Sequence, residues 1–539
     1  ASVSFDSDTM APTIIQDAHH PQHRASLAGN IVMMPTSRGS CSGSGVLLEL
    51  ALNGHAPAAL VFHEAEDILT LGAFIAARMF DRRVAVLRLT RESYDLLAAK
   101  PEAEIVGNRL VAGDLSLELS PLDPTALALS PQDQAMQDGA QGEAVKLAME
   151  AIFTMGVVQG ATRLTDITRG HIDGCIYAGR ANLVFAETIM NMGAQVTVPT
   201  TMNAISVDQE NWRSQGVPPI FGEPASRLAS AYVKMGARPT FTCAPYLDDD
   251  RPKVGEDIGW SESNAVIYAN SVLGARTVKH PDFVDLFVAM TGRAPLSGVY
   301  LDENRQAQVR LRFDLPEDYD EAIWPLIGWV AGQHAPDRIP LIEGLENASI
   351  GEDDLKALCA AFGTTSAMPI LHIRGITPEG DRMAKPGAEM HRVARETLAK
   401  AWVQLNSGPT EIDLVALGSP HFSLSETRRL AGLMQGRKCT ANTPMIVTLS
   451  RTTYADAAKE GLLSTLEEAG VRIIKDLCWC SISEPVFPPT AKTLMTNSGK
   501  YAHYAPGLSG RSVRFASLAD CVTATERGHM PKDLPFWLQ

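Results

Sequence analysis

Short apolar runs alternate with a helical pattern in the first part of the chain. Residues 30–34 (NIVMM), 58–62 (AALVF) and 84–89 (VAVLRL) have the length and composition of buried strands. Residues 65–80 between the last two runs have their apolar positions at helical spacing. Strands that alternate with helices predict an α/β layer architecture.

The hydrophobic pattern is interrupted at residues 119–135. This segment contains Leu119-Ser-Pro-Leu-Asp-Pro-Thr and then Ser130-Pro-Gln-Asp-Gln, and such clusters of Pro, Ser and Asp mark turns and loops. We therefore expect two units, a small α/β domain over residues 1–135 and a larger one over residues 136–539.

The pattern in the second unit is clearest at its two ends. A helix rich in Ala, Glu, Met and Leu is predicted over residues 141–155, and mixed loops and helices follow to about residue 350. The last third predicts a strand at 412–417, a helix at 425–434, a strand at 445–449, a helix at 454–469 and a strand at 471–474. This order is typical of a parallel sheet with right-handed crossovers.

Composition narrows the classes of function. The 539 residues include 47 Lys and Arg against 62 Asp and Glu, a net charge of −15, which argues against nucleic-acid binding. No apolar run approaches the roughly 20 residues of a membrane span; the best candidate, residues 46–62, carries Glu49, Asn53 and His55. The acidic, polar start resembles no signal or transit peptide. We expect a cytoplasmic protein with a small-molecule ligand.

The eight cysteines are too few for a disulfide scaffold. No CxxC pair or zinc-type spacing is present, and the closest pair is Cys478 and Cys480, separated by Trp479. The cysteines are therefore either buried small apolar residues or metal ligands.

Polar loops punctuated by glycine adjoin many of the strand-like runs. In open α/β sheets, ligands bind beyond the carboxyl ends of the strands, so the shared placement of these loops indicates a site. A lone His or Cys in such a loop is more often structural, and the loop 36–45, with four serines, also fits a solvated turn. The loops are 36–45, 171–175, 199–203, 242–246, 371–379, 418–423, 475–480 and 497–504.

Several of these segments resemble the aconitase X family. The stretch SLAGNIVMMPTSRGSCSGSGVLLELALNG is similar to its small, swivelling-domain piece. The motifs HIDGCIYAG, VPTTMNAISVD, FTCAPY, HIRGITPE, LGSPHFSL, DLCWC and TNSGKYAHY are similar to landmarks of its large piece, in the same order. The resemblance extends from about residue 24 to residue 525.

The order of the two pieces adds a further implication. They are separate chains in archaeal members and fused here with the small piece first, as in the bacterial type. The resemblance therefore implies a swivelling β/α domain joined to a multi-lobed aconitase-like α/β domain with parallel sheets, and no obligate hetero-partner. It implies a hydro-lyase that uses an iron–sulfur cluster to dehydrate cis-3-hydroxy-L-proline to Δ1-pyrroline-2-carboxylate.

The resemblance also implies a set of cluster ligands. In the archaeal type three cysteines hold the cluster, at positions that match Cys243, Ser419 and Cys478. Because one of these is a serine here, the bacterial type implies a smaller 2Fe–2S cluster, which normally takes four protein ligands. We expect Cys243, Cys478 and, as the third, Cys359, with Cys480 as the alternative; Cys41, Cys175, Cys439 and Cys521 are assigned to packing.

The remaining roles follow from the same resemblance and from the chemistry of dehydration. Ser40, in Arg38-Gly39-Ser40, matches the serine base of aconitase-like enzymes, and Arg38 and the glycine-rich turn suit a lowered hydroxyl pKa. Lys500 is the candidate for the substrate carboxylate. Candidates for the pocket wall are His171, Asp173, Asn203 and His421; for each of them a structural role is the alternative.

Three other functions remain open as alternatives. Dehydration of mevalonate 5-phosphate would need a second basic or N–H-rich loop for the phosphate, and none is visible. An RNA-binding regulator of the aconitase type fits the net charge of −15 poorly. A cluster-free binding or structural protein is the third class, and the absence of a sulfur-to-iron absorption band would identify it.

Overall fold

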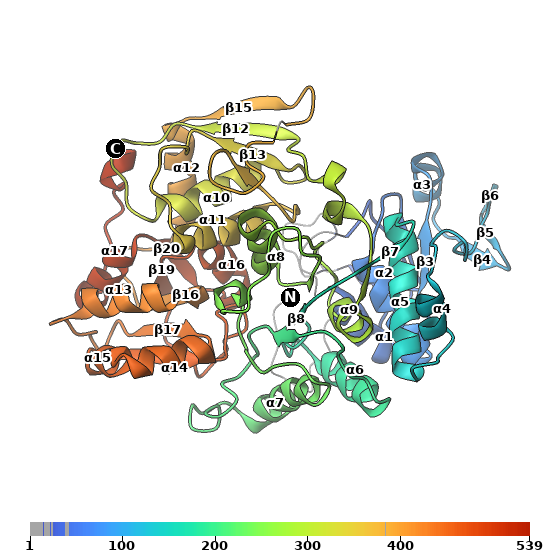
Figure 1. Cartoon of the computed structure of the whole chain (residues 1–539), viewed down its shortest axis with the longest axis horizontal. Helices are drawn as coiled ribbons and strands as arrows, with labels where there is room; N and C mark the ends of the chain where they lie inside the picture. Colours follow the sequence, from blue (N-terminus) through green and yellow to red (C-terminus); the bar gives the residue numbers. More distant parts are fainter. Residues whose placement is uncertain (1–14, 16–21, 23–24, 38–42, 383) are drawn as a thin grey trace.

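The structure, a computed structural model, describes residues 15, 22, 25–37, 43–382 and 384–539. Figure 1 shows the blue N-terminal region at one side of the molecule and the red C-terminal region at the other, with the green and yellow regions between them. The expected α/β architecture with mostly parallel sheets is confirmed.

The N-terminal region contains the predicted three-stranded sheet. Strands β1 (Ile31–Met33), β2 (Ala59–Phe62) and β3 (Ala85–Arg88) pair in parallel in that order. Helices α1 (Gly43–Leu52) and α2 (Ile68–Phe80) connect the strands, and α3 (Arg91–Ala98) follows them. Strands and helix α2 lie within three residues of their expected bounds. The core forms where α1 and α2 pack on the sheet, around Leu47, Leu60 and Phe62.

A second, antiparallel sheet in this region was not predicted. It consists of β4 (Glu104–Val106), β5 (Arg109–Ala112) and β6 (Leu115–Glu118). Two-residue turns at Gly107 and Gly113, both with positive φ, connect the strands. The strands are three or four residues long and largely exposed, so they lack the long apolar runs by which buried strands are recognised.

The segment expected to be a turn-rich boundary contains a short helix, α4 (Pro131–Gln137). Ser130 and Asp133 form a capping box at its start. The Asp133 carboxylate also accepts two hydrogen bonds from Arg293, at 2.7 and 3.0 Å. The ion pair fastens the segment to strand β11 (Arg293–Pro295).

Residues 143–304 form a mixed region around a second parallel sheet, of order β10-β8-β9. The predicted helix at 141–155 is α5 (Glu143–Gln159). The other elements are β7 (Leu164–Asp166), β8 (Gly170–Ile172), α6 (Arg180–Asn191), β9 (Thr200–Met202), α7 (Pro219–Lys234), β10 (Gly259–Trp260), α8 (Ser263–Tyr268), α9 (Val284–Thr291) and β11 (Arg293–Pro295).

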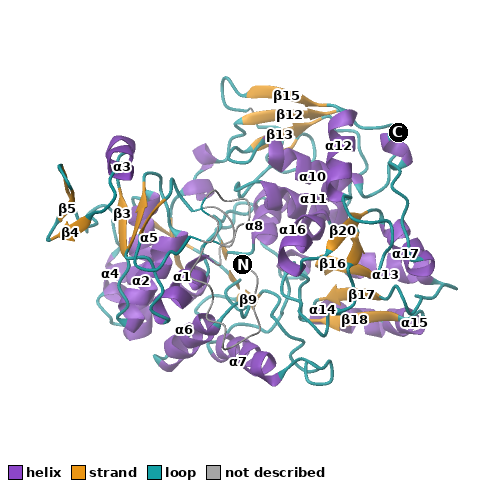
Figure 2. Cartoon of the chain, turned by 180° about the vertical axis from the view of Figure 1, so that it is seen from behind, coloured by secondary structure: helices purple, strands orange, loops and turns teal. Residues whose placement is uncertain are grey.

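A four-stranded parallel sheet of order β14-β13-β12-β15 follows, and Figure 2 shows it at the edge of the molecule, beside α10 and α12. Its strands are β12 (Val309–Phe313), β13 (Pro340–Glu343), β14 (His372–Ile373) and β15 (Glu389–Val393). The helices are α10 (Ile323–His334), α11 (Glu352–Thr365) and α12 (Arg395–Leu405). Helices α10 and α11 pack closely, because Gly328 and Gly332 leave no room for a side chain against α11.

The last third has the predicted parallel sheet, extended to five strands in the order β18-β17-β16-β19-β20. The strands are β16 (Leu414–Phe422), β17 (Met445–Leu449), β18 (Val471–Lys475), β19 (Thr493–Thr496) and β20 (Ser512–Phe515). The helices are α13 (Leu424–Met434), α14 (Arg451–Lys459), α15 (Leu462–Glu468), α16 (Gly499–Ser509) and α17 (Leu518–Arg527).

Two details of this sheet differ from expectation. The helix predicted over 454–469 is two helices, because Gly461 adopts a φ of 73° between α14 and α15. The strand predicted to end at Leu417 continues as β16 to Phe422, past a shift of register. The Gly418–Phe422 stretch is therefore part of a buried strand, where a loop was expected.

Candidate functional site

Three polar side chains stand in one row beyond the carboxyl ends of the β10-β8-β9 sheet. Within the sheet, His171 of β8 pairs with Thr201 of β9 on one side and with Trp260 of β10 on the other. Two residues further along each segment, the neighbouring residues are Asp173, Asn203 and Glu262, whose side chains point to the same face. Asn203 Nδ2 donates to Asp173 Oδ1 and, at 3.3 Å, to Glu262 Oε2. Asp173 and Asn203 lie beyond strand ends, although β9 (Thr200–Met202) falls inside the segment 199–203 that was expected to be a loop. Glu262 was not foreseen.

A buried ion pair extends this row toward the last third of the chain. Lys500 Nζ, on the first turn of α16, donates to Glu262 Oε1 at 2.7 Å. Burial raises the pKa of Glu262, but the Lys500 charge outweighs it and keeps that pKa below its ordinary value. Burial lowers the pKa of Lys500, whereas Glu262 and neighbouring thiols raise it well above its ordinary value. Both groups are charged at neutral pH.

Two further buried carboxyl groups lie at the start of α9. Asp285 accepts the backbone N–H groups of Asp173 at 2.7 Å and Gly174 at 3.2 Å, and so fixes the turn that carries Asp173. Asp282 is 5% exposed, and its Oδ1 has no hydrogen-bond partner among the described residues. Burial and the neighbouring Asp285 and Glu262 carboxylates raise the pKa of Asp282 well above its ordinary value.

Three cysteine thiols converge on the other side of Lys500. Cys243 and Cys478 form a small buried cluster with Ala204, and Cys480 packs against it. Hydrogen bonds from the Cys243 and Cys480 thiols lower the pKa of Cys478 well below its ordinary value. The Lys500 ammonium lies within electrostatic reach of all three thiols. Burial raises the pKa of the Cys243 thiol well above its ordinary value, and the hydrogen bond to Cys478 does the same for Cys480. The site therefore favours the thiolate, the form that binds metal, at Cys478.

Backbone contacts bring these cysteines together from distant parts of the chain. Thr242 N donates to the carbonyl of Met202, at the end of β9, at 3.0 Å and so places Cys243 beside the sheet. Leu477 pairs with Ile205, and Ile205 N donates to the carbonyl of Asp476 at 2.8 Å, which brings Cys478 next to Ala204.

Backbone strain precedes both central cysteines by two residues. Phe241 has a φ of 43° and Asp476 a φ of 71°, in the left-handed region that favours glycine. A third strained residue, Phe283 with a φ of 81°, directly follows Asp282. Each such residue costs about 1–3 kcal/mol and persists where the surrounding structure holds it, commonly at functional sites. The strain therefore coincides with the thiols and with Asp282.

His421, a candidate for the pocket wall, lies against the thiols. Its backbone N–H donates to Cys243 Sγ at 3.2 Å, and its Nε2 lies 2.5 Å from the carbonyl oxygen of Leu477, next to Cys478. Ser419, on the same strand, is buried, and its Oγ has no partner among the described residues. Ser419 lines a small cavity of about 20 Å³ together with Lys356 and Ser498.

Cys359 lies apart from the three convergent thiols. It is on α11 within the main hydrophobic core, and burial raises the pKa of its thiol. The structure brings Cys480, the alternative, to Cys243 and Cys478. Of the cysteines expected to pack, Cys175 and Cys521 belong to the core and Cys439 is partly buried against it; Cys41 lies outside the described residues.

His171 is fully buried beneath the row of polar side chains. Its Nδ1 lies 2.8 Å from Thr201 Oγ1, and its ring packs at 5.7 Å from that of Trp260. Burial lowers its pKa to about 3, so the imidazole is neutral. Its Nε2 has no partner among the described residues.

The N-terminal domain reaches this site through α1. Glu49 Oε2 accepts the backbone N–H of Ala181 at 2.6 Å, at the first turn of α6. A Cβ on Gly45 would approach Phe283 to 3.6 Å, so the start of α1 abuts the residue that follows Asp282. Arg38 and Ser40 lie outside the described residues, in the segment that immediately precedes this helix.

The described residues on each side of that segment are fixed to the start of α2. Ser37 Oγ donates to Glu66 Oε1 at 2.6 Å, and Ser44 Oγ donates to the carbonyl of Ile68 at 2.8 Å. The Glu66 carboxylate also accepts the backbone N–H groups of Leu69 and Thr70, at 2.7 and 2.9 Å. Two of the four serines in the predicted loop thus have structural hydrogen bonds.

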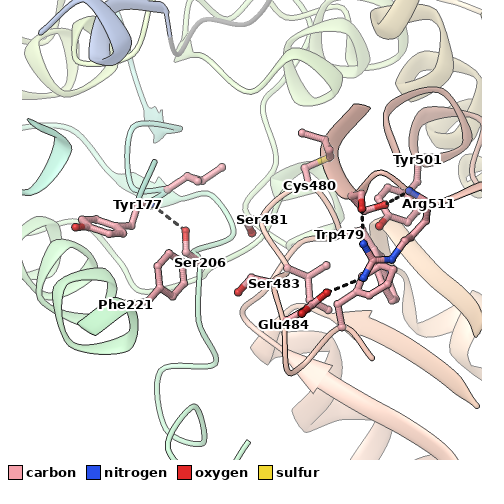
Figure 3. Close-up of a pocket in the computed structure, with 15 residues that line it drawn as sticks. Tyr177, Ser206, Phe221, Trp479, Cys480, Ser481, Ser483, Glu484, Tyr501 and Arg511 are labelled. Carbon is pink, nitrogen blue, oxygen red and sulfur yellow. Dashed lines mark hydrogen bonds and ion pairs between the residues drawn. The ribbon is translucent and has the colours of Figure 1, made fainter. Parts of the chain in front are cut away.

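A cavity of about 260 Å³ opens beside Cys480. Figure 3 shows Tyr177, Ser206 and Phe221 on one side of it and Cys480, Ser481 and Tyr501 on the other. The cavity thus separates the region of the β10-β8-β9 sheet from the last third of the chain, and it exposes one of the three thiols to a space of small-molecule size.

Two kinds of structure are absent from the described part of the chain. None of its helices has the length and apolar character of a membrane span. Within the same residues, no group of three or more His, Cys, Asp or Glu side chains is arranged to bind a metal ion as it stands. The three thiols therefore converge without forming a ready coordination shell.

Sequence reasoning missed Glu262 and Asp282. Glu262 follows the two-residue strand β10, which is too short to be recognised from its hydrophobic pattern. Asp282 precedes α9 in the segment His280-Pro-Asp-Phe. Pro and Asp there indicate the start of a helix, but they do not by themselves indicate a functional residue.

Models of four aconitase X domains match the chain in succession. They are the swivel domain at residues 2–111, the first domain at 126–303, the second at 307–403 and the third at 412–527. A cis-3-hydroxy-L-proline dehydratase of Pseudomonas aeruginosa is 50% identical over 535 residues, which cover 97% of this chain and 92% of that protein.

The large and small subunits of a two-subunit enzyme each match a different part of this chain. The phosphomevalonate dehydratase large subunit of Methanothermobacter thermautotrophicus is 33% identical over 385 residues, covering 71% of this chain and 94% of the subunit. Its small subunit is 40% identical over 67 residues, covering 12% of this chain and 51% of the subunit. One chain here spans regions of both, so no hetero-partner is needed to supply them.

The crystal structure of Thermococcus kodakaraensis aconitase X in its holo-form has the same fold as most of this chain. The TM-score is 0.67 at 29% sequence identity, and the match covers 74% of this chain and all of that one.

Proposed function

The chain belongs to the aconitase X family, and on that basis we propose that it is a hydro-lyase that dehydrates cis-3-hydroxy-L-proline to Δ1-pyrroline-2-carboxylate. The observation that carries this proposal is the 50% identity to a dehydratase of that substrate over 97% of the chain. Relatives named for phosphomevalonate are more distant, at 33% identity.

The reaction places three demands on the protein. The proton on the carbon beside the carboxylate must be removed, hydroxide must leave the neighbouring carbon, and the enolate-like charge that develops must be stabilised. The first product is an enamine, which tautomerises to the cyclic imine, so the overall change is the loss of one water molecule.

We assign the substrate carboxylate to Lys500. One of its three ammonium protons is donated to Glu262 at 2.7 Å, and two remain for a ligand. Its charge would also stabilise the enolate-like transition state. We assign proton removal to Ser40, with Arg38 lowering the pKa of its hydroxyl, because both match the family's catalytic loop, which precedes the anchored start of α1.

We propose that Cys243, Cys478 and Cys480 hold an iron–sulfur cluster. The donor chemistry fits, because three thiols converge beside a lysine charge and one of them is favoured as thiolate. Cys480 replaces Cys359 in this set, since Cys359 lies in the main core instead. When bound, the cluster supplies a Lewis acid for the leaving hydroxyl group.

Two further observations support the cluster type and the cellular compartment that we propose. Serine stands at the position where the archaeal relatives have the middle cysteine, and this supports a 2Fe–2S cluster. The seven described cysteines are all free thiols, which fits a reducing compartment and supports a cytoplasmic enzyme.

The substrate can be tested directly with the iron-reconstituted enzyme. We expect pyrroline-2-carboxylate from cis-3-hydroxy-L-proline and at most a few per cent of that rate from the trans-3- and the two 4-hydroxyproline isomers. The assay measures the imine product for each isomer under anaerobic conditions.

The same preparation distinguishes the alternatives. Turnover of mevalonate 5-phosphate in place of hydroxyproline would overturn the proposed substrate. Salt-sensitive binding of RNA together with inactivity on every isomer would favour a regulator instead.

The role of Lys500 predicts separate effects on binding and on stability. Lys500→Met should raise KM for cis-3-hydroxy-L-proline by roughly tenfold to hundredfold, because a charged hydrogen bond contributes about 1.5–3 kcal/mol. It should also destabilise the protein by about 3–5 kcal/mol, because Glu262 is then buried without its partner.

The double variant Lys500→Met/Glu262→Gln is the matched control. Removing both charges should restore most of the stability, measured by chemical denaturation, and leave KM high. Iron content measured alongside reports whether the thiols still load. An unchanged KM in Lys500→Met would place the carboxylate elsewhere.

A further inference from the structure

We propose that Asp173 and Asp282 form the subsite for the secondary ammonium group of the substrate, opposite the lysine that takes its carboxylate. The inference rests on the proposed function and specifies how the site recognises an amino acid. The subsite lies beyond the end of β8 and before α9, against the turn at Gly174.

A series of polar contacts leads from the Lys500 ammonium to the Asp173 carboxyl group. Lys500 bonds to Glu262 at 2.7 Å, Glu262 bonds to Asn203 at 3.3 Å, and Asn203 bonds to Asp173. A cyclic amino acid has its carboxylate and its ammonium on the same carbon atom, so it needs a cation and an anion close together. This arrangement supplies both.

The unpaired oxygen of Asp282 indicates a ligand rather than a structural role. A Cβ on Gly174 would lie 3.8 Å from Asp282 Cβ and 3.3 Å from the hydroxyl of Tyr232, so these side chains meet at the turn that carries Asp173. Both Asp282 Oδ1 and Tyr232 Oη are buried without a hydrogen-bond partner among the described residues. Burying such groups without a partner is costly, and a donor on a bound ligand removes the cost.

Asp285 differs from Asp282 and serves as the structural comparison. Its oxygens accept the backbone N–H groups of Asp173, Gly174 and Leu286. Asp285 is therefore occupied in holding the turn, whereas Asp282 has an oxygen with no hydrogen-bond partner among the described residues.

The electrostatics favour a cation at this place. Burial, Glu262 and Asp282 raise the pKa of Asp173 well above its ordinary value, and burial, Asp285 and Glu262 do the same for Asp282. A cation bound between them relieves this repulsion. A protonated ring nitrogen has two N–H donors, one for each carboxylate. The described carboxylates are not arranged to hold a metal ion.

The proposal is tested by calorimetric titration of the holoenzyme with two ligands that differ at one atom. L-Proline has the ring ammonium, and (S)-tetrahydrofuran-2-carboxylate has an ether oxygen in its place. Wild-type protein should bind L-proline at least about tenfold more tightly. Asp173→Asn and Asp282→Asn should each reduce this preference to about twofold or less while the affinity for the ether compound stays within about twofold.

Asp318→Asn, at an exposed aspartate in the segment before α10, is the matched control and should keep the full preference. If Asp173→Asn and Asp282→Asn keep the preference for L-proline over the ether compound, the assignment is overturned. Equal binding of the two ligands by wild-type protein overturns it as well, without any variant. If wild-type protein binds neither ligand and turns over no hydroxyproline isomer, the proposed function itself fails. If it turns over cis-3-hydroxy-L-proline with no ammonium preference, only the subsite fails.

Discussion

Replacing Ser40 with alanine should lower the turnover of cis-3-hydroxy-L-proline by about a hundredfold to ten-thousandfold and leave KM and iron content nearly unchanged. Removal of a general base typically costs this much. The loss falls on kcat because the proton is transferred only in the transition state, whereas substrate binding does not need the hydroxyl. Steady-state kinetics on the reconstituted variant measure both constants.

The other serines of the loop serve to distinguish a base from a merely polar turn. Ser37 and Ser44 bond to Glu66 and to the carbonyl of Ile68, so their replacement should cost about 1 kcal/mol of stability. Ser42→Ala, and Ser464→Ala at an exposed position on α15, should keep near wild-type turnover. Retention of more than about a tenth of the turnover in Ser40→Ala would mean that the base is elsewhere, since that is less than the smallest effect expected.

Replacing Cys243 or Cys478 with alanine should abolish the visible absorption band and the activity together. Both thiols lie in the small buried cluster beside Lys500, and an iron–sulfur cluster normally takes its protein ligands from thiolates. Loss of one central ligand leaves two convergent thiols, too few to hold the cluster. Iron content and absorbance after anaerobic reconstitution measure the effect.

The third ligand is decided by comparing two further variants. Cys480→Ala should lose most of the iron, whereas Cys359→Ala should keep it and lose only packing energy in the core around α11. Cys521→Ala, another fully buried cysteine, is the control for a packing defect alone. The reverse result, iron retained without Cys480 and lost without Cys359, would restore the ligand set first expected from the sequence.

The sequence predicted those parts of the fold whose signals are local. The strand at 445–449 is β17 within the same bounds, because a run of five buried residues, four of them apolar, identifies a strand. Resemblance of motifs gave the family and the order of its parts. The break at Gly461 was not predicted, because the helical pattern continues on both sides of it. Strands β4 to β6 were not predicted, because they are short and largely exposed.

The site was predictable only in part, for a geometric reason. Asp173 and Asn203 immediately follow β8 and β9, and they were proposed because they lie in loops beside strand-like runs. Which thiol joins Cys243 depends on contacts between distant parts of the chain, such as the bridge of Ile205 to Leu477. Residues two apart in an extended strand lie on the same face, so the spacing of Cys478 and Cys480 gave no ground for ranking Cys480 behind Cys359. The segment from Cys478 to Cys480 is a turn instead.

The distance along the chain between Cys243 and Cys478 has a consequence for biosynthesis. At roughly 5–20 residues per second, a ribosome needs about 10–50 seconds to add the 235 residues that separate them. During that time Cys243 has neither Cys478 beside it nor the backbone N–H of His421 to donate to its sulfur. With the proposed ligand set, the cluster can therefore be completed only on a nearly complete polypeptide.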